Sequence, residues 1–244
     1  MVTGTPRMVT DGLVFYVDAA NTKSYSGSGT TWTDLSRTQT SASLFNGPTF
    51  DNSNGGSISF DGTNDYGSIP SISNQLTNEC TAQVWVKIPS TYTASFGTIF
   101  TNRLNGDQFT TFLFGIDDRA VVRSWNPSGV SNNRAAVCVV GGGGSSIMAV
   151  WRTGSFTNNE WVNLTLSIGS SINFYYNGVL TMTTGSVGTF QNPNINVRLG
   201  NQYDTGSNDY PIRGNIAIAS VYNRALSASE VLQNFEATRE RFGL

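Results

Sequence analysis

The pattern that most constrains this chain is a series of short segments in which apolar and polar residues alternate, with turn sequences about every ten residues. The alternation is most regular in residues 161–168, where valine, leucine and isoleucine fall at every second position. A period of two is typical of a β-strand with two unlike faces. Short strands with frequent turns are typical of a two-sheet antiparallel sandwich. We therefore expect an all-β fold.

The same alternation predicts the other strands. They are expected at residues 13–17, 58–60, 82–88, 97–102, 109–116, 120–125, 134–140, 147–152, 172–176, 179–183 and 195–199. Asn177-Gly178 matches a type I′ hairpin turn. Residues 21–54 are expected to be a long loop with one short strand near Leu44. The four glycines 141–144 are also expected in a loop, because glycine loses the most backbone entropy on ordering.

The last thirty residues predict one helix, over about residues 227–242, after a final strand. Ser227 and Glu230 have the spacing of a capping box, and Leu226 and Val231 that of a hydrophobic staple. The expected buried face consists of Val231, Phe235, Thr238 and Phe242. Gly243 is placed to end the helix.

No change of composition divides the chain, so we expect one domain over residues 12–244. Residues 1–11 are polar and lack periodicity, which favours an arm that tethers a neighbouring subunit. Only 12% of residues are charged and the net charge is −2, so neither nucleic acid nor an anionic membrane is an expected partner. The start of the sequence has no apolar signal-peptide segment. The chain is thus expected to act where it is made, or to leave the cell by lysis or a dedicated secretion machine.

The two cysteines, Cys80 and Cys138, both lie in apolar segments that are expected to be strands. A disulfide and two buried free thiols are both compatible with this placement, and the apolar surroundings favour free thiols.

Several blocks of the sequence resemble, in order, the laminin-G-like, concanavalin A-like lectin/glucanase jelly roll. They are residues 12–21, 32–36, 59–66, 81–86, 161–166, 174–178 and 221–230. Residues 24–32 and the ending 241–244 look most like copies of this domain in structural proteins of tailed bacteriophages. The resemblance implies a two-sheet jelly-roll sandwich with its first and last strands adjacent and the C-terminal helix docked beside them. It does not by itself imply a reaction.

The catalytic groups of common hydrolases are missing from the sequence. The chain has no histidine, which excludes a Ser-His-Asp triad and a histidine-ligated zinc site. Members of the superfamily that cleave glucans carry two glutamates and an aspartate close together on one strand. The glutamates here stand elsewhere: they are Glu79, Glu160, Glu230, Glu236 and Glu240. Asp117-Asp118, the adjacent acidic pair, favours a turn, and we expect no enzyme activity.

Calcium is the one cofactor that the sequence suggests, since related jelly rolls often bind it with carboxylate, amide and carbonyl oxygens. Asp61, Asn64 and Asp65 cluster at a strand end, and Asp204, Asn208 and Asp209 form a second cluster. The alternative for the first cluster is an Asx turn that Asp65 caps, and residue context favours this turn. One structural calcium at Asp61 and Asp65 remains the competing hypothesis.

Sugar binding needs exposed aromatic rings that can stack on pyranose faces. The best placed rings in the sequence are Trp125, Trp151, Tyr203 and Tyr210. Trp32, Trp85 and Trp161 stand in the family blocks and are expected in the core, where aromatic side chains usually pack. The alternative is that most of the first four rings also fill the sandwich.

The function expected from the sequence is that of a non-enzymatic bacteriophage virion structural protein. It would decorate the capsid or belong to the neck or tail, and would present a lectin-like binding module. Its expected partners are other virion proteins and host-surface or environmental glycans, and a homo-oligomer is compatible with this role. The alternative is a secreted bacterial carbohydrate-binding lectin module found outside the cell.

Overall fold

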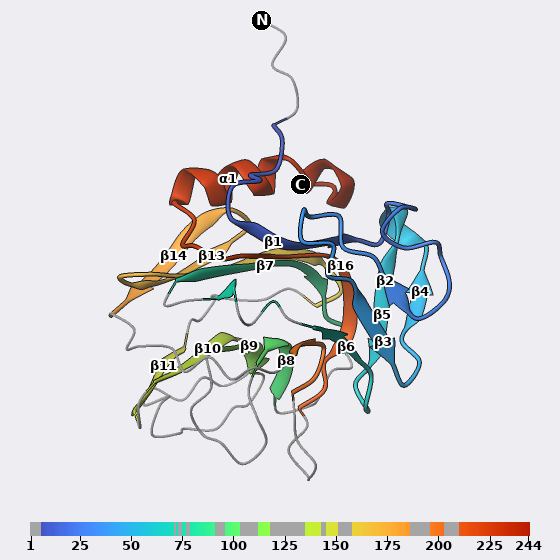
Figure 1. Cartoon of the computed structure of the whole chain (residues 1–244), viewed down its shortest axis with the longest axis horizontal. Coiled ribbons are helices and arrows are strands. Elements are labelled where there is room, and N and C mark those ends of the chain that lie inside the picture. The colour runs from blue at the N-terminus through green and yellow to red at the C-terminus, as the bar shows by residue number, and fades with distance from the viewer. Residues whose placement is uncertain are drawn as a thin grey trace, which may run out of the picture.

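The computed structural model describes residues 6–70, 72, 75–76, 79–90, 96–102, 112–117, 135–142, 145–150, 158–185, 196–202 and 210–244. Two β-sheets are stacked as layers, and the C-terminal helix lies on the outer side of one of them (Figure 1). All pairings between the described strands are antiparallel. The expected two-sheet jelly-roll sandwich is confirmed.

The first sheet, sheet A, lies beneath the helix. Its strands are β1 (Leu13–Asp18), β4 (Thr49–Asp51), β5 (Ser57–Asp61), β7 (Cys80–Lys87), β12 (Trp161–Ile168), β13 (Ile172–Tyr176), β14 (Val179–Thr184) and β16 (Arg213–Tyr222). Their order is β14-β13-β12-β7-β16-β5-β4, and β1 also pairs with β16. The first and last strands are therefore adjacent, as the family resemblance implied.

The second sheet, sheet B, forms the other layer. Its strands are β2 (Thr31–Trp32), β3 (Ala42–Phe45), β6 (Tyr66–Ile69), β8 (Phe96–Thr101), β9 (Phe112–Asp117), β10 (Ala135–Gly142), β11 (Ser145–Val150) and β15 (Val197–Leu199). Their order is β11-β10-β9-β8-β15-β6-β3-β2. The helical segments with described bounds are η1 (Ser53–Gly55, 3₁₀), α1 (Ala228–Glu236, α) and η3 (Arg239–Phe242, 3₁₀).

The main core lies between the two sheets and is built from the apolar face of each alternating strand. Phe15, Phe60, Phe100 and Phe114 are at most 1% exposed and belong to this one cluster, as does Trp32. Burying a phenylalanine side chain contributes about 1.5–3 kcal/mol. The alternation seen in the sequence thus selects which face of each strand enters the core.

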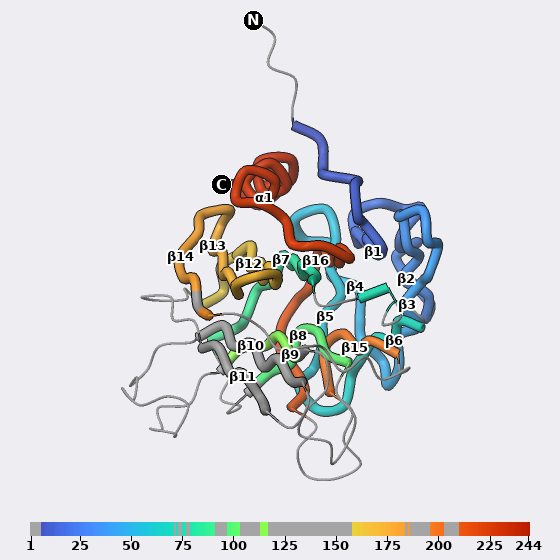
Figure 2. The backbone as a smooth tube through the Cα atoms, turned by 60° about the vertical axis from the view of Figure 1, so that its left-hand side comes forward, coloured from blue at the N-terminus to red at the C-terminus, as the bar shows by residue number. Residues whose placement is uncertain are grey.

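The outer face of sheet A is also buried, because helix α1 covers it (Figure 2). Trp85 and Trp161 lie on this outer face, in a cluster with Phe235 and Phe242. Gln83 and Asn163 are buried nearby, and Gln83 Nε2 donates to Asn163 Oδ1 at 3.0 Å. Trp32, Trp85 and Trp161 are all buried, as expected, although the last two pack under the helix and not between the sheets.

Three expectations about local structure need correction. The helix does not run to residue 242: α1 ends at Glu236, and a 3₁₀ turn follows after Thr238. Gly141 and Gly142 are not in a loop, because they extend β10 and pair with β11. The segment 21–54 holds three short strands, β2, β3 and β4, and not one.

The break in the helix has a visible cause. The Trp85 indole N–H donates to Thr238 Oγ1 at 2.9 Å, and Phe242 stacks on Trp85 with ring centroids 4.0 Å apart. Thr238 departs from helical geometry with φ −129°, which turns the chain so that Phe242 lies over the indole. Gly243 then ends the segment in the left-handed conformation at φ 77°, as predicted.

Cys80 begins β7 as a free and fully buried thiol, in agreement with the favoured interpretation. Burial raises its pKa to about 12. The side chain of Cys138 lies outside the described residues. Within the part of the chain that the structure describes, no helix is long and apolar enough to cross a membrane.

Candidate functional site

The predicted calcium cluster forms the turn between β5 and β6. Asp61 Oδ1 accepts from the Thr63 N–H at 2.7 Å, and Asp65 Oδ2 accepts from the Asp61 N–H at 2.9 Å. These bonds make the Asx turn that the sequence offered as the alternative to a metal site. Asn64 is exposed, and its carbonyl oxygen accepts from Asn46 Nδ2 at 2.7 Å.

The Asp65 carboxyl is the unusual group of this turn, since it is only 3% exposed. Its pKa is raised, first by burial and then by the neighbouring Asp61 carboxylate, while the bond from the Asp61 N–H lowers it. The structure thus brings two carboxyl groups of the first cluster together. Over the described ranges, no group of three or more His, Cys, Asp or Glu residues could hold a metal ion. The second cluster, Asp204, Asn208 and Asp209, lies outside those ranges.

An aromatic stack stands on the outer face of sheet B beside this turn. The rings of Phe45 in β3 and Tyr66 in β6 are stacked with centroids 4.9 Å apart, and the Arg198 guanidinium lies 4.2 Å from the Tyr66 ring. Tyr66 directly follows Asp65, and Phe45 pairs with Tyr66 across the strands. Both faces of the Tyr66 ring are therefore covered, while Phe45 keeps 43% of its surface exposed.

Sequence reasoning missed Phe45. The signal that could have found it is the alternation in residues 42–45, in which Ala42 and Leu44 are buried and Ser43 and Phe45 are exposed. A large aromatic residue on the polar side of an alternating strand is a candidate contact residue, because an exposed apolar ring there does not serve the core.

Tyr210 is the one predicted sugar-contacting residue within the described part of the chain. It is partly buried, and its carbonyl oxygen accepts from the Thr98 N–H at 2.9 Å. Arg213, three residues further on, lies opposite Asp61 in the pairing of β16 with β5. Tyr210 thus lies toward the same end of the sandwich as the Asp61–Asp65 turn. The other three, Trp125, Trp151 and Tyr203, lie outside the described residues.

The glutamates that bear on catalysis are far apart. Glu79 precedes β7 and Glu160 precedes β12, and these two strands pair antiparallel over eight residues. At about 3.3 Å per residue the two carboxyl groups lie at opposite ends of the strand pair, roughly 25 Å apart. The remaining glutamates, Glu230, Glu236 and Glu240, lie on the C-terminal helical segments.

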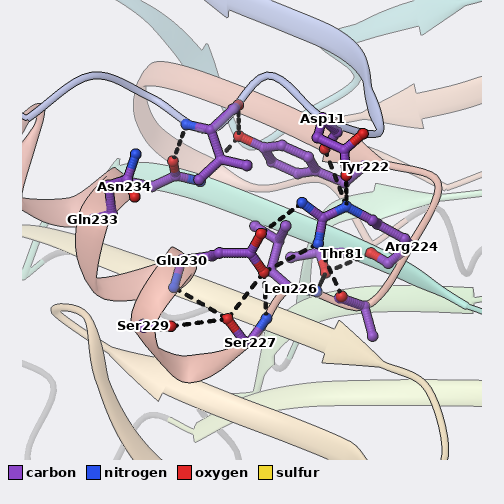
Figure 3. Close-up of polar contacts among 12 residues, drawn as sticks. Asp11, Thr81, Tyr222, Arg224, Leu226, Ser227, Ser229, Glu230, Gln233 and Asn234 are labelled. Atoms are coloured by element: carbon purple, nitrogen blue, oxygen red, sulfur yellow. Dashed lines mark hydrogen bonds and ion pairs between the residues drawn. The ribbon is translucent and has the colours of Figure 1, made fainter.

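A second polar site, at the start of α1, is shown in Figure 3. The predicted capping box is present: the Glu230 N–H donates to Ser227 Oγ at 3.4 Å, and the Ser227 N–H donates to Glu230 Oε2 at 2.9 Å. Leu226 and Val231, the predicted staple, are buried in one cluster. Sequence reasoning missed Arg224, whose guanidinium pairs with Glu230 at 2.6 Å.

Arg224 joins the cap to the N-terminal arm. Its Nε lies 2.9 Å from Asp11 Oδ2 and also donates to the Asp11 carbonyl oxygen at 3.2 Å. The Arg224 guanidinium lowers the pKa of Glu230 to about 2, which is the largest effect on that carboxyl. The same side chain therefore ties residue 11 to the first turn of the last helix.

Residues 61–232 match the family described as the concanavalin A-like lectin/glucanases superfamily, and the chain belongs to it. A search of the curated proteins finds no match.

Among solved structures, one similar to this chain is domain 4 of AbnA, an extracellular arabinanase from Geobacillus stearothermophilus, in complex with arabinotriose. It is 15% identical with a TM-score of 0.64, and the aligned region covers 93% of this chain and 99% of that one. Trypanosoma rangeli sialidase in complex with sialic acid is 16% identical with a TM-score of 0.62, and the aligned region covers 94% of this chain and 33% of the sialidase. The receptor binding domain of botulinum neurotoxin C/D mosaic serotype is 11% identical with a TM-score of 0.64, and the aligned region covers 93% of this chain and 52% of that domain. At these identities the likeness shows the fold alone: a lectin-like β-sandwich.

Proposed function

We propose that this chain is a non-enzymatic carbohydrate-binding module, and that Phe45 is its principal contact with sugar. The observation that carries the proposal is the partly exposed Phe45 ring, which stacks on Tyr66, whose own ring is in turn covered by the Arg198 guanidinium. An aromatic face of this kind offers an apolar surface for the C–H groups of a sugar ring. Family membership supports the proposal, as do the arabinotriose and sialic acid named for two of the similar structures.

The absence of catalysis is part of the proposal. Glycoside hydrolysis uses two carboxyl groups about 5–9.5 Å apart. Glu79 and Glu160 are too distant from each other for this, and Glu230 is engaged by Arg224 and Ser227. Asp61 and Asp65 are close together, but each holds a backbone N–H of its own turn. These engagements favour structural roles for the described carboxylates.

A glycan array of the native chain tests the binding. We expect retention on polysaccharides, and Phe45→Ala should weaken it about 2- to 12-fold, since an aromatic contact contributes about 0.5–1.5 kcal/mol. Leu180→Ala is the matched control, because Leu180 is equally exposed, at 46% against 43%, but lies on the edge strand β14 of the other sheet. A blank array, or equal losses in the two variants, would refute the assignment.

We further propose that the module is displayed on a bacteriophage particle, as a capsid decoration, neck or tail-associated protein. The support is the resemblance of residues 24–32 and 241–244 to phage structural proteins. Mass spectrometry of purified particles tests it, and we expect a stoichiometric copy number. Absence from particles would instead favour the alternative, a secreted bacterial lectin module.

One structural calcium at Asp61 and Asp65 also belongs to the proposal. Asp65 has a raised pKa because it is buried beside the Asp61 carboxylate, and a cation would favour the ionised form of Asp65. Carbonyl oxygens of the turn fit the hard oxygen ligands that calcium prefers. When bound, the ion would fix the turn that precedes Tyr66.

A further inference from the structure

The N-terminal arm is held to the body mainly through its own backbone. The Val9 N–H donates to Asn234 Oδ1 at 2.8 Å, and Tyr222 Oη donates to the Val9 carbonyl oxygen at 3.0 Å. Gln233 Nε2 donates to the Arg7 carbonyl oxygen at 2.7 Å. Side chains of α1 and β16 thus bind an extended backbone, and these three residues with Arg224 form what we call the arm clamp (Figure 3).

The arm clamp is rigid and prepared for its occupant. Asn234 and Tyr222 are at most 1% exposed, and Asn234 Nδ2 donates to Tyr222 Oη at 2.9 Å. This bond orients the amide oxygen and the phenol hydrogen toward the two backbone groups of Val9. Two buried polar side chains are thereby committed to one residue of the arm, and leaving them unpaired would be costly.

An apolar pocket accompanies these polar groups. Val9 packs against the cluster of Tyr175, Tyr222, Leu226 and Val231. The clamp therefore selects an extended segment with an apolar residue between two backbone hydrogen bonds. This combination of backbone bonds and a side-chain pocket is how extended peptides are commonly recognised.

The arm is separable from the body as a unit. Apart from the bond from the Leu13 N–H to the Thr10 carbonyl oxygen, its polar contacts join residues that are 213 to 226 positions apart in the sequence. It ends at Gly12, whose φ of +75° suits a glycine hinge. A cleft of about 440 Å³ is lined by Pro6, Arg7 and Met8 on one side and by residues that include Tyr16 and Arg241 on the other, so the segment before Val9 is only partly packed against the body.

From this arrangement we propose that the arm clamp also binds residues 6–11 of a second copy of the chain, so that copies are linked by arm exchange. Exchange preserves the bonds of the arm clamp and the packing of Val9, and it changes the path through Gly12 together with the bond from the Leu13 N–H to the Thr10 carbonyl oxygen, which makes it an inexpensive route to association. The balance between the two forms then depends on protein concentration, since docking within one chain competes with docking between chains. This interaction surface is independent of glycan binding.

Two variants that each add one cysteine test the proposal. Arg7→Cys and Gln233→Cys place thiols at two exposed positions. In the native chain these positions are in contact, because the Gln233 side chain donates to the Arg7 carbonyl oxygen. One variant is labelled with ¹⁵N, the two are mixed, and a short bis-maleimide is added; mass spectrometry then identifies the linked peptides. Cys80 is buried, and the native chain treated in the same way gives the background from native cysteines.

We expect linkage between the labelled and the unlabelled chain, with a yield that rises with protein concentration. Adding Val9→Asp to the Arg7→Cys copy should lower the yield at least 10-fold, because the carboxylate cannot enter the apolar pocket. The double variant, with both cysteines in one chain, reports docking within a chain. If it links internally while the mixture yields no more than the Val9→Asp background at several hundred micromolar, arm exchange is refuted.

Discussion

Glu230 should make folding stability depend on pH in a way that one substitution can isolate. Its pKa lies at about 2 in the folded chain against 4.5 as the ordinary value, chiefly because Arg224 pairs with it. At about 1.4 kcal/mol per pKa unit this amounts to about 3 kcal/mol. The Arg224 and Glu230 side chains are 26% and 29% exposed, so solvent screening reduces the expected contribution to about 1–2 kcal/mol.

The sign follows from the direction of the shift. A lowered folded-state pKa stabilises the protein fully above the unfolded value, so the contribution is complete above pH 4.5. It is lost as the pH falls from 4.5 toward about 2, and less than half of it remains at about pH 3. The cap geometry itself need not change, because glutamine at this position can still serve a capping box.

Glu230→Gln should therefore lower the free energy of unfolding by about 1–2 kcal/mol at pH 7, and by less than half as much at pH 3. Urea unfolding followed by tryptophan fluorescence at both pH values measures this difference. Glu240→Gln, at an exposed position of η3, is the control and should change stability by less than about 0.5 kcal/mol. An equal loss for Glu230→Gln at pH 7 and pH 3 would refute the reasoning.

Three further outcomes are expected. Gly214→Ala places a Cβ 2.5 Å from a backbone carbonyl oxygen at φ +151°, and should cost about 2–4 kcal/mol in thermal unfolding. Gly47→Ala, at φ +104° in open space, should cost only about 1 kcal/mol, and equal losses would contradict the clash. Calcium should raise the melting temperature and a chelator lower it, with the difference abolished by Asp65→Asn; no shift of the midpoint in the native chain would count against the site. In a Cys138→Ser background, Cys80 should resist a thiol reagent until denaturant is added, and rapid labelling of the folded protein would show that its burial is wrong.

The alternation of apolar and polar residues predicted most of the described strands, because the pleat of a strand imposes a period of two. It could not show what covers each face. Gln83 and Asn163 stand on the polar side of their alternating strands, yet both are buried. Only the return of the last helix over sheet A, a contact between distant parts of the chain, determines this burial.

The ends of elements were less predictable for similar reasons. The apolar spacing from Val231 to Phe242 fits one continuous helix, but the bond from Trp85 to Thr238 interrupts it. Gly141 and Gly142 lack strand propensity, but both pair with β11, opposite Ser146 and Ser145. In both places a tertiary contact overrides the local preference.

The candidate site was predictable only in part. The Asp61–Asp65 turn followed from the spacing of its side chains, because an Asx turn is a local structure. The stack of Phe45, Tyr66 and Arg198 joins three strands that are distant in the sequence, and no local pattern shows that they are neighbours. The arm clamp likewise joins the two ends of the described chain.

The central claim is binding without catalysis, and one experiment addresses both halves of it. The native chain is incubated with an immobilised polysaccharide that it retains on the array, and both the bound protein and the reducing ends released are followed over a day. The account predicts stable retention with no new reducing ends above the protein-free control. Release of reducing ends in proportion to protein concentration, or failure of the chain to stay bound, would contradict it.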